Sequence, residues 1–227
     1  MKRGVVLALA VLMLWAFFAQ CVTSMVNESP TVDEQAHLMR GYVYLELGDL
    51  RFKIGHPVLA NAFSAVPVWA LTDVDIPVDE PSWQAANWSE FADRFVWQPG
   101  NPVSEMFFLG RLATVGLGLA GAALLFRWAR QWSGAYAGVV ALALSVFDPN
   151  ILAHSRLVTD DVAVMVLGLA SAYGLWRTMI TGRVRFVLLS GVMLGLAQGS
   201  KYSALVLLPV LALLGFIWGF RYRGQTR

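Results

Sequence analysis

The sequence predicts an all-α membrane protein, a polytopic helical bundle of about six transmembrane helices with a long first extracytoplasmic loop. Hydrophobic residues make up 57% of the 227 residues and charged residues only 14%, whereas soluble domains are about a quarter charged. The charges are also sorted by sign, because the acidic residues and many of the basic residues fall at opposite ends of the apolar segments. We expect residues 1–227 to form a single membrane domain.

The first apolar segment, Gly4 to Val22, has the length needed to cross a hydrocarbon core of about 30 Å. The start of the chain, MKR followed by an apolar run, is also the pattern of a cleavable signal peptide. The run is longer than the usual signal core, however, and residues 19–21 (AQC) make a poor cleavage site. We therefore expect an uncleaved anchor.

Five further apolar stretches follow the long loop, and several are shorter than 18 residues. Each of these alone could be a helix in a soluble core, but the sorted charges favour membrane spans. The stretches are Glu105–Phe126, Gly134–Phe147, Val162–Trp176, Phe186–Gly199 and Ala204–Phe220.

The basic residues predict a cytoplasmic N-terminus in the cell membrane. With six spans the inner side then receives 10 of the 17 basic residues, as the positive-inside rule expects, and all 15 acidic residues fall outside or at outer helix ends. The inner basic residues are Lys2, Arg3, Arg127, Arg130, Arg177, Arg183, Arg185, Arg221, Arg223 and Arg227. Four tryptophans fall near the same inner interface, as in an aromatic belt: Trp128, Trp132, Trp176 and Trp218.

The extracytoplasmic loop, residues 23–104, is too rich in aromatic and aliphatic residues to be disordered. Its first part, residues 32–47, is predicted to be a helix that Thr31 or Asp33 caps and Gly48 ends. Residues 57–71 are apolar but contain a proline, so they pack on the bundle or lie in the interface. Residues 82–98 carry five aromatic rings among polar residues, which predicts an interfacial helix with its rings at headgroup depth.

Two classes of site are excluded by composition. Cys21 is the only cysteine, so neither an internal disulfide nor a cysteine-based metal cluster can form. A net charge of +2 gives no sign of nucleic-acid binding.

Asp33 and Glu34 are the strongest candidates for chemistry in the loop. Adjacent helical residues point about 100° apart, so one of the two carboxylates enters a pocket. His37 can share a helix face with either acid. The alternative for both acids is helix capping, because acids are common in a first turn.

Four other side chains are candidates near the outer ends of the spans. His56 precedes an apolar helix and could hold a phosphate oxygen, although a single surface histidine is commonly inert. Asp160 begins the fourth span, and Asp160 or its neighbour could merely cap it. Lys201 and Arg111 lie so close to the hydrocarbon that each must be paired or must extend to the headgroups.

The sequence resembles the membrane glycosyltransferases of family 39, which include protein O-mannosyltransferases and bacterial aminoarabinose transferases. The resemblance is carried by five segments in the family's order. They are TVDEQAHLMRGYVYLELGDL, GHPVLANAFSAVP, GRLATVGLGLAGAALLF, NILAHSRLVTDDVAV and GVMLGLAQGSKYSALVLLP.

The resemblance implies roles for several of these residues. The family's essential acid in the first outer loop falls on Asp33, and its second acid falls on Asp160. His56 takes a position linked to the lipid phosphate, and Lys201 looks like the family's lysine after the fifth span. The implied reaction moves a sugar from a polyprenyl-phosphate donor to an acceptor hydroxyl on the extracytoplasmic side, with Asp33 as general base and the cations, including Arg111, at the leaving phosphate.

Several alternatives stay open. Asp160 could position acceptor or sugar, or share a divalent metal with Asp33, although no metal or other cofactor is required by the sequence. Family members run beyond twice this length, so the chain resembles the N-terminal catalytic half of such an enzyme, and a further subunit could supply the other half. The rival functions are an inactive truncated homologue, a non-enzymatic membrane subunit or a transporter-like bundle.

Overall fold

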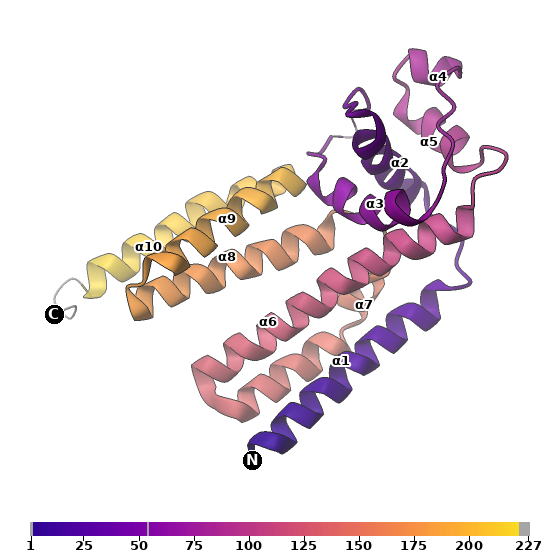
Figure 1. The fold of residues 1–227 in the computed structure, drawn as a ribbon. Helices are drawn as coiled ribbons and strands as arrows, with labels where there is room; N and C mark the ends of the chain where they lie inside the picture. The colour runs from indigo at the N-terminus through magenta and orange to yellow at the C-terminus, as the bar shows by residue number, and fades with distance from the viewer. Residues whose placement is uncertain (1, 54, 223–227) are drawn as a thin grey trace.

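The computed structural model describes residues 2–53 and 55–222, and every regular element within them is helical (Figure 1). The long helices are α1 (Arg3–Met25), α6 (Val103–Val146), α8 (Asp161–Thr181), α9 (Val184–Ser200) and α10 (Leu207–Tyr222). The shorter elements are α2 (Val32–Leu47), α3 (Leu59–Leu71), α4 (Pro81–Gln84), α5 (Trp88–Val96), α7 (Pro149–Ser155) and the 3-10 helix η1 (Tyr202–Val206). The predicted all-α fold class is confirmed.

Four segments of the described chain are long and apolar enough to cross a membrane. They are Arg3–Met25, Val103–Val146, Asp161–Thr181 and Tyr202–Phe220. The helix α9 is also apolar but has only 17 residues. The 44-residue α6 bends sharply and folds back, so it contains both the second and the third predicted span. The chain is therefore a polytopic membrane bundle.

The bend in α6 lies at Ser133 and Gly134. Gly134 has a φ of 89°, which residues with a side chain rarely adopt. The leg after the bend packs on the leg before it, because a Cβ at Gly138 would lie 2.8 Å from the Cβ of Arg130. The sequence prediction placed a break between two spans at this point, and the break is a tight turn.

The return leg of α6 is much shorter than the outgoing leg. At 1.5 Å per residue, residues 135–146 extend roughly 18 Å, whereas residues 103–132 extend roughly 45 Å. The chain continues as α7, whose start is capped by the Asp148 carboxylate. That carboxylate accepts hydrogen bonds of 2.9 Å from the backbone N–H groups of Asn150 and Ile151. The expected short outer loop after the third span is thus largely a helix that begins partway along the bundle.

Residues 26–102, here called the cap, sit at one end of the long helices (Figure 1). Below the cap, α1 lies beside both legs of α6, while α8, α9 and α10 form a second group. The cap helix α3 contacts α6 and also α9. The cap therefore rests on both groups of helices and spans the space between them.

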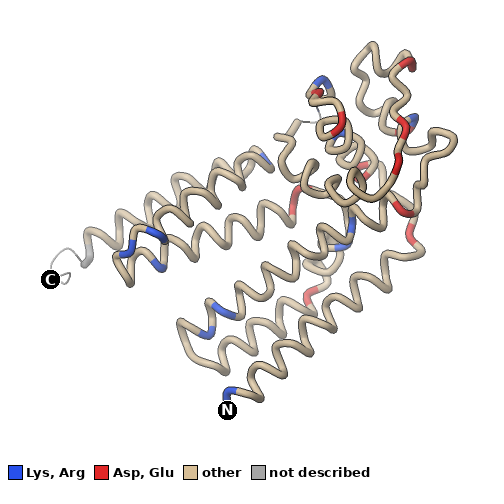
Figure 2. The backbone as a smooth tube through the Cα atoms, in the orientation of Figure 1, with Lys and Arg blue, Asp and Glu red and all other residues tan. Residues whose placement is uncertain are grey.

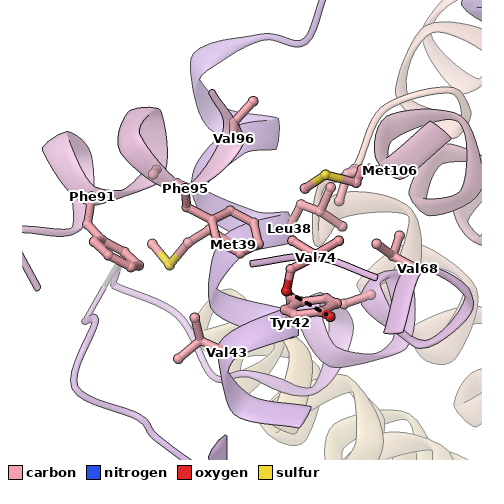
Figure 3. Packing of buried hydrophobic residues seen from close by; sticks show 14 of the residues in the cluster. Leu38, Met39, Tyr42, Val43, Val68, Val74, Phe91, Phe95, Val96 and Met106 are labelled. Carbon is pink, nitrogen blue, oxygen red and sulfur yellow. Dashed lines mark hydrogen bonds between the residues drawn. The ribbon is translucent and has the colours of Figure 1, made fainter. Parts of the chain in front are cut away.

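The cap has a hydrophobic core, shown in Figure 3, which Met106 and Phe107 of α6 and Val158 complete. Leu38, Met39 and Val43 of α2 are completely buried against Phe91 and Phe95 of α5. Burial of side chains of this size stabilises the folded state by about 1.5–3 kcal/mol each. The predicted helix 32–47 is confirmed with both of its boundaries, since Thr31 caps α2 and Gly48 ends it with a φ of 66°.

The segment predicted to lie in the interface differs from expectation in the direction of its rings. Trp83, Phe91 and Phe95 are buried inside the cap rather than turned toward headgroups. The Phe91 ring stacks on Phe52 with centroids 4.8 Å apart. Only Trp88 and Trp97 are exposed. The aromatic residues of this segment therefore build a core, because two short helices bury them against α2.

Most charged residues are distributed along the bundle as the sequence predicted (Figure 2), but Asp148, expected at the outer end, caps α7 partway along it. Acidic residues gather in the cap, whereas the bend of α6 and the turn between α8 and α9 carry only Lys and Arg among their charges. Arg223 and Arg227, which were assigned to the inner side, lie outside the described residues.

This distribution predicts that the cap faces the outside of the cell and the α8–α9 turn faces the cytoplasm. An introduced cysteine at Asp79 is expected to react with an impermeant thiol reagent in intact cells, whereas one at Arg183 is expected to react only after lysis. Both positions are exposed, and the native Cys21 is 1% exposed and gives little background. Labelling at Arg183 in sealed cells would contradict this orientation.

Candidate functional site

The helix α2 carries three of the candidate polar side chains on one face. Asp33, His37 and Arg40 are spaced i, i+4 and i+7, which places them along one stripe of the helix. The N-terminal cap of α2 is a reciprocal capping box between Thr31 and Glu34. Glu34 takes part in these capping hydrogen bonds, whereas the exposed carboxylate of Asp33, also in the first turn, has no hydrogen-bond or ion-pair partner among the described residues.

A close approach between α2 and α3 brings an amide to this stripe. A Cβ at Gly41 would collide with the backbone carbonyl of Asn61, so only glycine permits the two helices to lie so near. The Asn61 side chain is 2% exposed, and its Oδ1 lies 3.2 Å from Nδ1 of His37. The expectation that His37 pairs with one of the two acids is replaced by this contact with Asn61.

His56 lies where the cap meets the second group of helices. Its backbone carbonyl accepts a hydrogen bond of 2.5 Å from Nη1 of Arg40, a side chain only 7% exposed. Its ring Nε2 lies 3.9 Å from Oδ2 of Asp160 at the start of α8. Burial lowers the pKa of the Arg40 guanidinium, with the nearby Asp160 acting in the opposite direction. The loop that contains His56 thus joins α2 to α8.

Lys201, at the end of α9, is held by two carboxylates of α8. Its Nζ lies 3.1 Å from Oδ1 of Asp160 and 2.7 Å from Oδ1 of Asp161. Burial lowers the pKa of Lys201, but the hydrogen bonds to the two carboxylates outweigh it, so the pKa lies above its usual value. Lys201 is therefore a charged, paired residue and not one that extends to the headgroups. Asp160 begins α8 without a side-chain cap and directs its carboxylate to Lys201.

Several buried polar atoms in this region have no hydrogen-bond partner among the described residues. They are Nε of Arg40, Nδ1 of His56, Nδ2 of Asn61 and Oδ2 of Asp160. An unsatisfied buried donor or acceptor destabilises a fold by about 1–3 kcal/mol. Four such atoms at one place are typical of a site that a polar ligand or water completes.

An apolar cleft of about 640 Å³ opens beside these polar residues. It lies between α6, α7, α8 and the segment from η1 to α10. Its lining includes Val164, one turn after Asp160, and Ser203, two residues after Lys201. The cleft therefore lies in the membrane part of the bundle, and two of its lining residues are close in sequence to the polar cluster.

Glu34 of the cap and Arg111 of α6 form a buried ion pair, here called the clamp. The two side chains are 0% and 2% exposed, and the guanidinium binds the carboxylate through both oxygens at 2.7 and 2.8 Å. Burial raises the pKa of Glu34, but hydrogen bonds from Arg111 and from two backbone N–H groups outweigh it, so the pKa lies below its usual value. The clamp fastens the start of α2 to the outer end of α6.

The clamp leaves Arg111 no free donor. Besides its two bonds to Glu34, the guanidinium donates to the backbone carbonyls of Met25, Glu28 and Ser29 at 2.9–3.2 Å. These bonds engage all five of its N–H groups. Glu34 also accepts a hydrogen bond from the backbone N–H of Val158 at 3.0 Å. In this arrangement Glu34 and Arg111 hold the start of α2 against α6.

The described residues contain no group of three or more His, Cys, Asp or Glu side chains that could hold a metal ion. The surroundings of Asp160 are cationic, because Lys201 is bound to it and His56 lies nearby.

The structure brings His56, Asp160 and Lys201 into one cluster, as expected for residues of one site. It adds Arg40, Asn61, Asp161 and Tyr202, whose ring lies 6.4 Å from that of His56. Two of these additions carry a sequence signal. Arg40 and Asn61 are single polar residues inside otherwise apolar helical runs, and burying them requires a partner.

Comparison with known proteins bears on the membrane part of the chain. Residues 104–224, more than half of the chain, match the family model described as dolichyl-phosphate-mannose-protein mannosyltransferase. The matched residues include Asp160 and Lys201 but not Asp33 or His56. No curated protein and no solved structure matches the chain. The match confirms the resemblance to family 39, so the chain belongs to the dolichyl-phosphate-mannose-protein mannosyltransferase family of membrane glycosyltransferases.

Proposed function

We propose that the chain transfers a sugar from a polyprenyl-phosphate donor to an acceptor hydroxyl on the extracytoplasmic side. The observation that carries the proposal is the set of unpartnered buried atoms where the cap meets the start of α8. Arg40 and Asn61 each direct a buried N–H donor without a partner there, and His56 adds a ring nitrogen. Donors of this kind, near a cationic lysine, fit the oxygens of a phosphate.

The cleft supports a donor with a long apolar tail. Its lining is almost entirely apolar side chains and glycines of α6, α8 and the segment from η1 to α10. A polyprenyl chain can lie in such a cleft while its phosphate stays at the cluster. A soluble sugar nucleotide has no apolar chain to bind in this cleft.

The stripe on α2 supports the position of the base. Asp33 and Arg40 are seven residues apart, which separates their Cα atoms by roughly 10 Å along the helix axis. Because the two side chains lie on the same face, their ends can lie closer together than their Cα atoms. The reacting anomeric carbon then fits between a phosphate at Arg40 and the carboxylate of Asp33. His37 lies between them and can contact the sugar.

In the proposed reaction Asp33 takes the proton of the acceptor hydroxyl while the oxygen of that hydroxyl attacks the anomeric carbon of the donor sugar. The bond from that carbon to the phosphate oxygen breaks, and the polyprenyl phosphate leaves with the additional negative charge. Arg40, His56 and Lys201 stabilise this charge in a water-poor site, where charge-assisted contacts are strong. Asp160 positions His56 and Lys201 and so orients the cations.

Glu34 and Arg111 have no contact with substrate in this proposal, although both were candidates from the sequence. Their bonds to each other and to the backbone account for their burial. They support the reaction by fixing the start of α2, which carries Asp33.

Binding of the donor tests the phosphate site. Arg40→Gln, His56→Ala and Lys201→Ala are each expected to weaken the binding of a polyprenyl-phosphate sugar by roughly ten- to a hundredfold, because each removes a charge-assisted contact. Affinity is measured with the purified chain in detergent, and thermal unfolding shows that each variant folds. Arg94→Gln is the control, since Arg94 is 56% exposed in the cap and away from the cleft. Unchanged affinity in all three site variants would contradict the proposed site.

A turnover assay distinguishes an active enzyme from an inactive homologue or a non-enzymatic subunit. The purified chain is expected to release polyprenyl phosphate from the donor in the presence of an acceptor, alone or after addition of membranes that contain a partner subunit. Donor binding without turnover in both conditions would instead support the inactive homologue or the non-enzymatic subunit.

A further inference from the structure

The end of the bundle opposite the cap is strongly basic. It contains the bend of α6 and the turn between α8 and α9, and Figure 2 shows Lys and Arg at both places. The described residues 106–147 and 162–222 contain no aspartate or glutamate. The arginines at these two places are Arg127, Arg130, Arg177, Arg183 and Arg185.

A pocket of about 410 Å³ lies on the last turns of α6 before the bend. It is lined by Phe126, Arg127, Arg130 and Gln131. The Arg130 guanidinium lies 6.0 Å from the centre of the Phe126 ring, so an aromatic face borders the cationic groups. The pocket thus combines two positive charges with an apolar wall.

A third arginine is held beside this pocket from α8. Oε1 of Gln131 accepts a hydrogen bond of 3.0 Å from the Tyr173 hydroxyl and one of 3.4 Å from Nη1 of Arg177. The Arg177 guanidinium also lies 4.7 Å from the centre of the Phe186 ring. Its buried Nε has no hydrogen-bond partner among the described residues. Arg177 is thus fixed in place with a donor still to be satisfied.

Aromatic rings place this end of the bundle at the level of lipid headgroups. The Trp128 ring packs on Trp132 and Trp176 with centroids 6.3 and 5.9 Å apart. The outer rings of the group are open to the surroundings, since Trp132 is 69% and Tyr136 is 78% exposed. Rings of this kind gather where hydrocarbon meets headgroups.

We propose that the pocket of Arg127, Arg130 and Gln131, with Arg177 beside it, binds the phosphate of an anionic phospholipid. Arginine forks bind phosphate oxygens through paired hydrogen bonds. The acyl chains of the bound lipid lie against the exposed aromatic rings, which a soluble phosphate could not use. The pocket lies at the other end of the bundle from Asp160 and Lys201 and shares no lining residue with the apolar cleft, so it does not depend on the proposed reaction.

The experiment compares lipid binding by charge-matched variants. The full chain is placed in vesicles of phosphatidylcholine with a small fraction of phosphatidylglycerol, extracted, and examined by native mass spectrometry for retained lipid. The parent chain is expected to retain phosphatidylglycerol in preference to phosphatidylcholine. Arg127→Gln combined with Arg130→Gln is expected to reduce that preference by at least about tenfold.

The control is Arg183→Gln combined with Arg185→Gln, which removes the same charge from the same end of the bundle. A smaller loss in the control than in the pocket variant supports the site. Equal losses would mean that overall charge attracts the lipid, and the proposal would be overturned. Glycerol phosphate is added as a competitor, and displacement of phosphatidylglycerol by it would overturn the assignment to a lipid.

Discussion

Replacing Asp33 with asparagine is expected to lower the rate of sugar transfer by about 10²- to 10⁴-fold, the contribution of a general base. Asparagine keeps the shape of the side chain but cannot accept the proton of the acceptor hydroxyl. Stability should change little, because the Asp33 carboxylate is exposed and Thr31 caps the helix. The rate is measured at saturating donor, so that a change in donor affinity does not contribute.

The matched control is Asp93→Asn, the same change at an exposed position of the cap. It is expected to leave both rate and stability as in the parent chain. The assignment of the base would be wrong if Asp33→Asn turned over at the parental rate. Retained donor binding in an inactive Asp33→Asn variant would show that the loss lies in the chemical step.

Replacing Arg111 with leucine is expected to destabilise the protein by about 3–5 kcal/mol, because it leaves the Glu34 carboxylate buried without its cation. The same change frees three backbone carbonyls that the guanidinium now satisfies. The effect is measured as a lower midpoint of thermal unfolding in detergent and as faster proteolysis of the cap.

Two further variants test whether loss of the clamp causes the lower stability of Arg111→Leu. Adding Glu34→Gln to Arg111→Leu removes the uncompensated charge and is expected to recover part of the lost stability. Arg94→Leu breaks an exposed ion pair with Glu80 and is expected to cost less than about 1 kcal/mol. If the Arg111 and Arg94 variants unfold at the same temperature, the clamp does not stabilise the cap as described.

The sequence predicted the helices well, because hydropathy, capping and glycine stops are local properties. The helix 32–47 has Thr31 at its start and Gly48 at its end, as expected. The pairing of side chains could not be predicted in the same way. Glu34 and Arg111 are 77 residues apart and Lys201 and Asp160 are 41 apart, so their contacts depend on how the helices pack.

The prediction for the aromatic rings of the cap failed for a related reason. Rings among polar residues, as in residues 82–98, are compatible with both a membrane interface and a small core. The rings form a small core because apolar side chains of α2 cover Phe91 and Phe95. The site residues Arg40 and Asn61 could have been found as polar residues within apolar runs. Averaging hydropathy over a window hides such individual residues.

The clamp also constrains the order in which parts of the protein can assemble during synthesis. Glu34 is synthesised 77 residues before Arg111 and 124 residues before Val158, whose backbone N–H completes its hydrogen bonds. At about 5–20 residues per second, the ribosome needs roughly 6–25 s to supply that last partner. Arg111, its cation, is supplied after the first 77 of these residues, and Val158 only at the end of the interval. The final docking of the cap is therefore a late step, after the hairpin of α6 has entered the membrane.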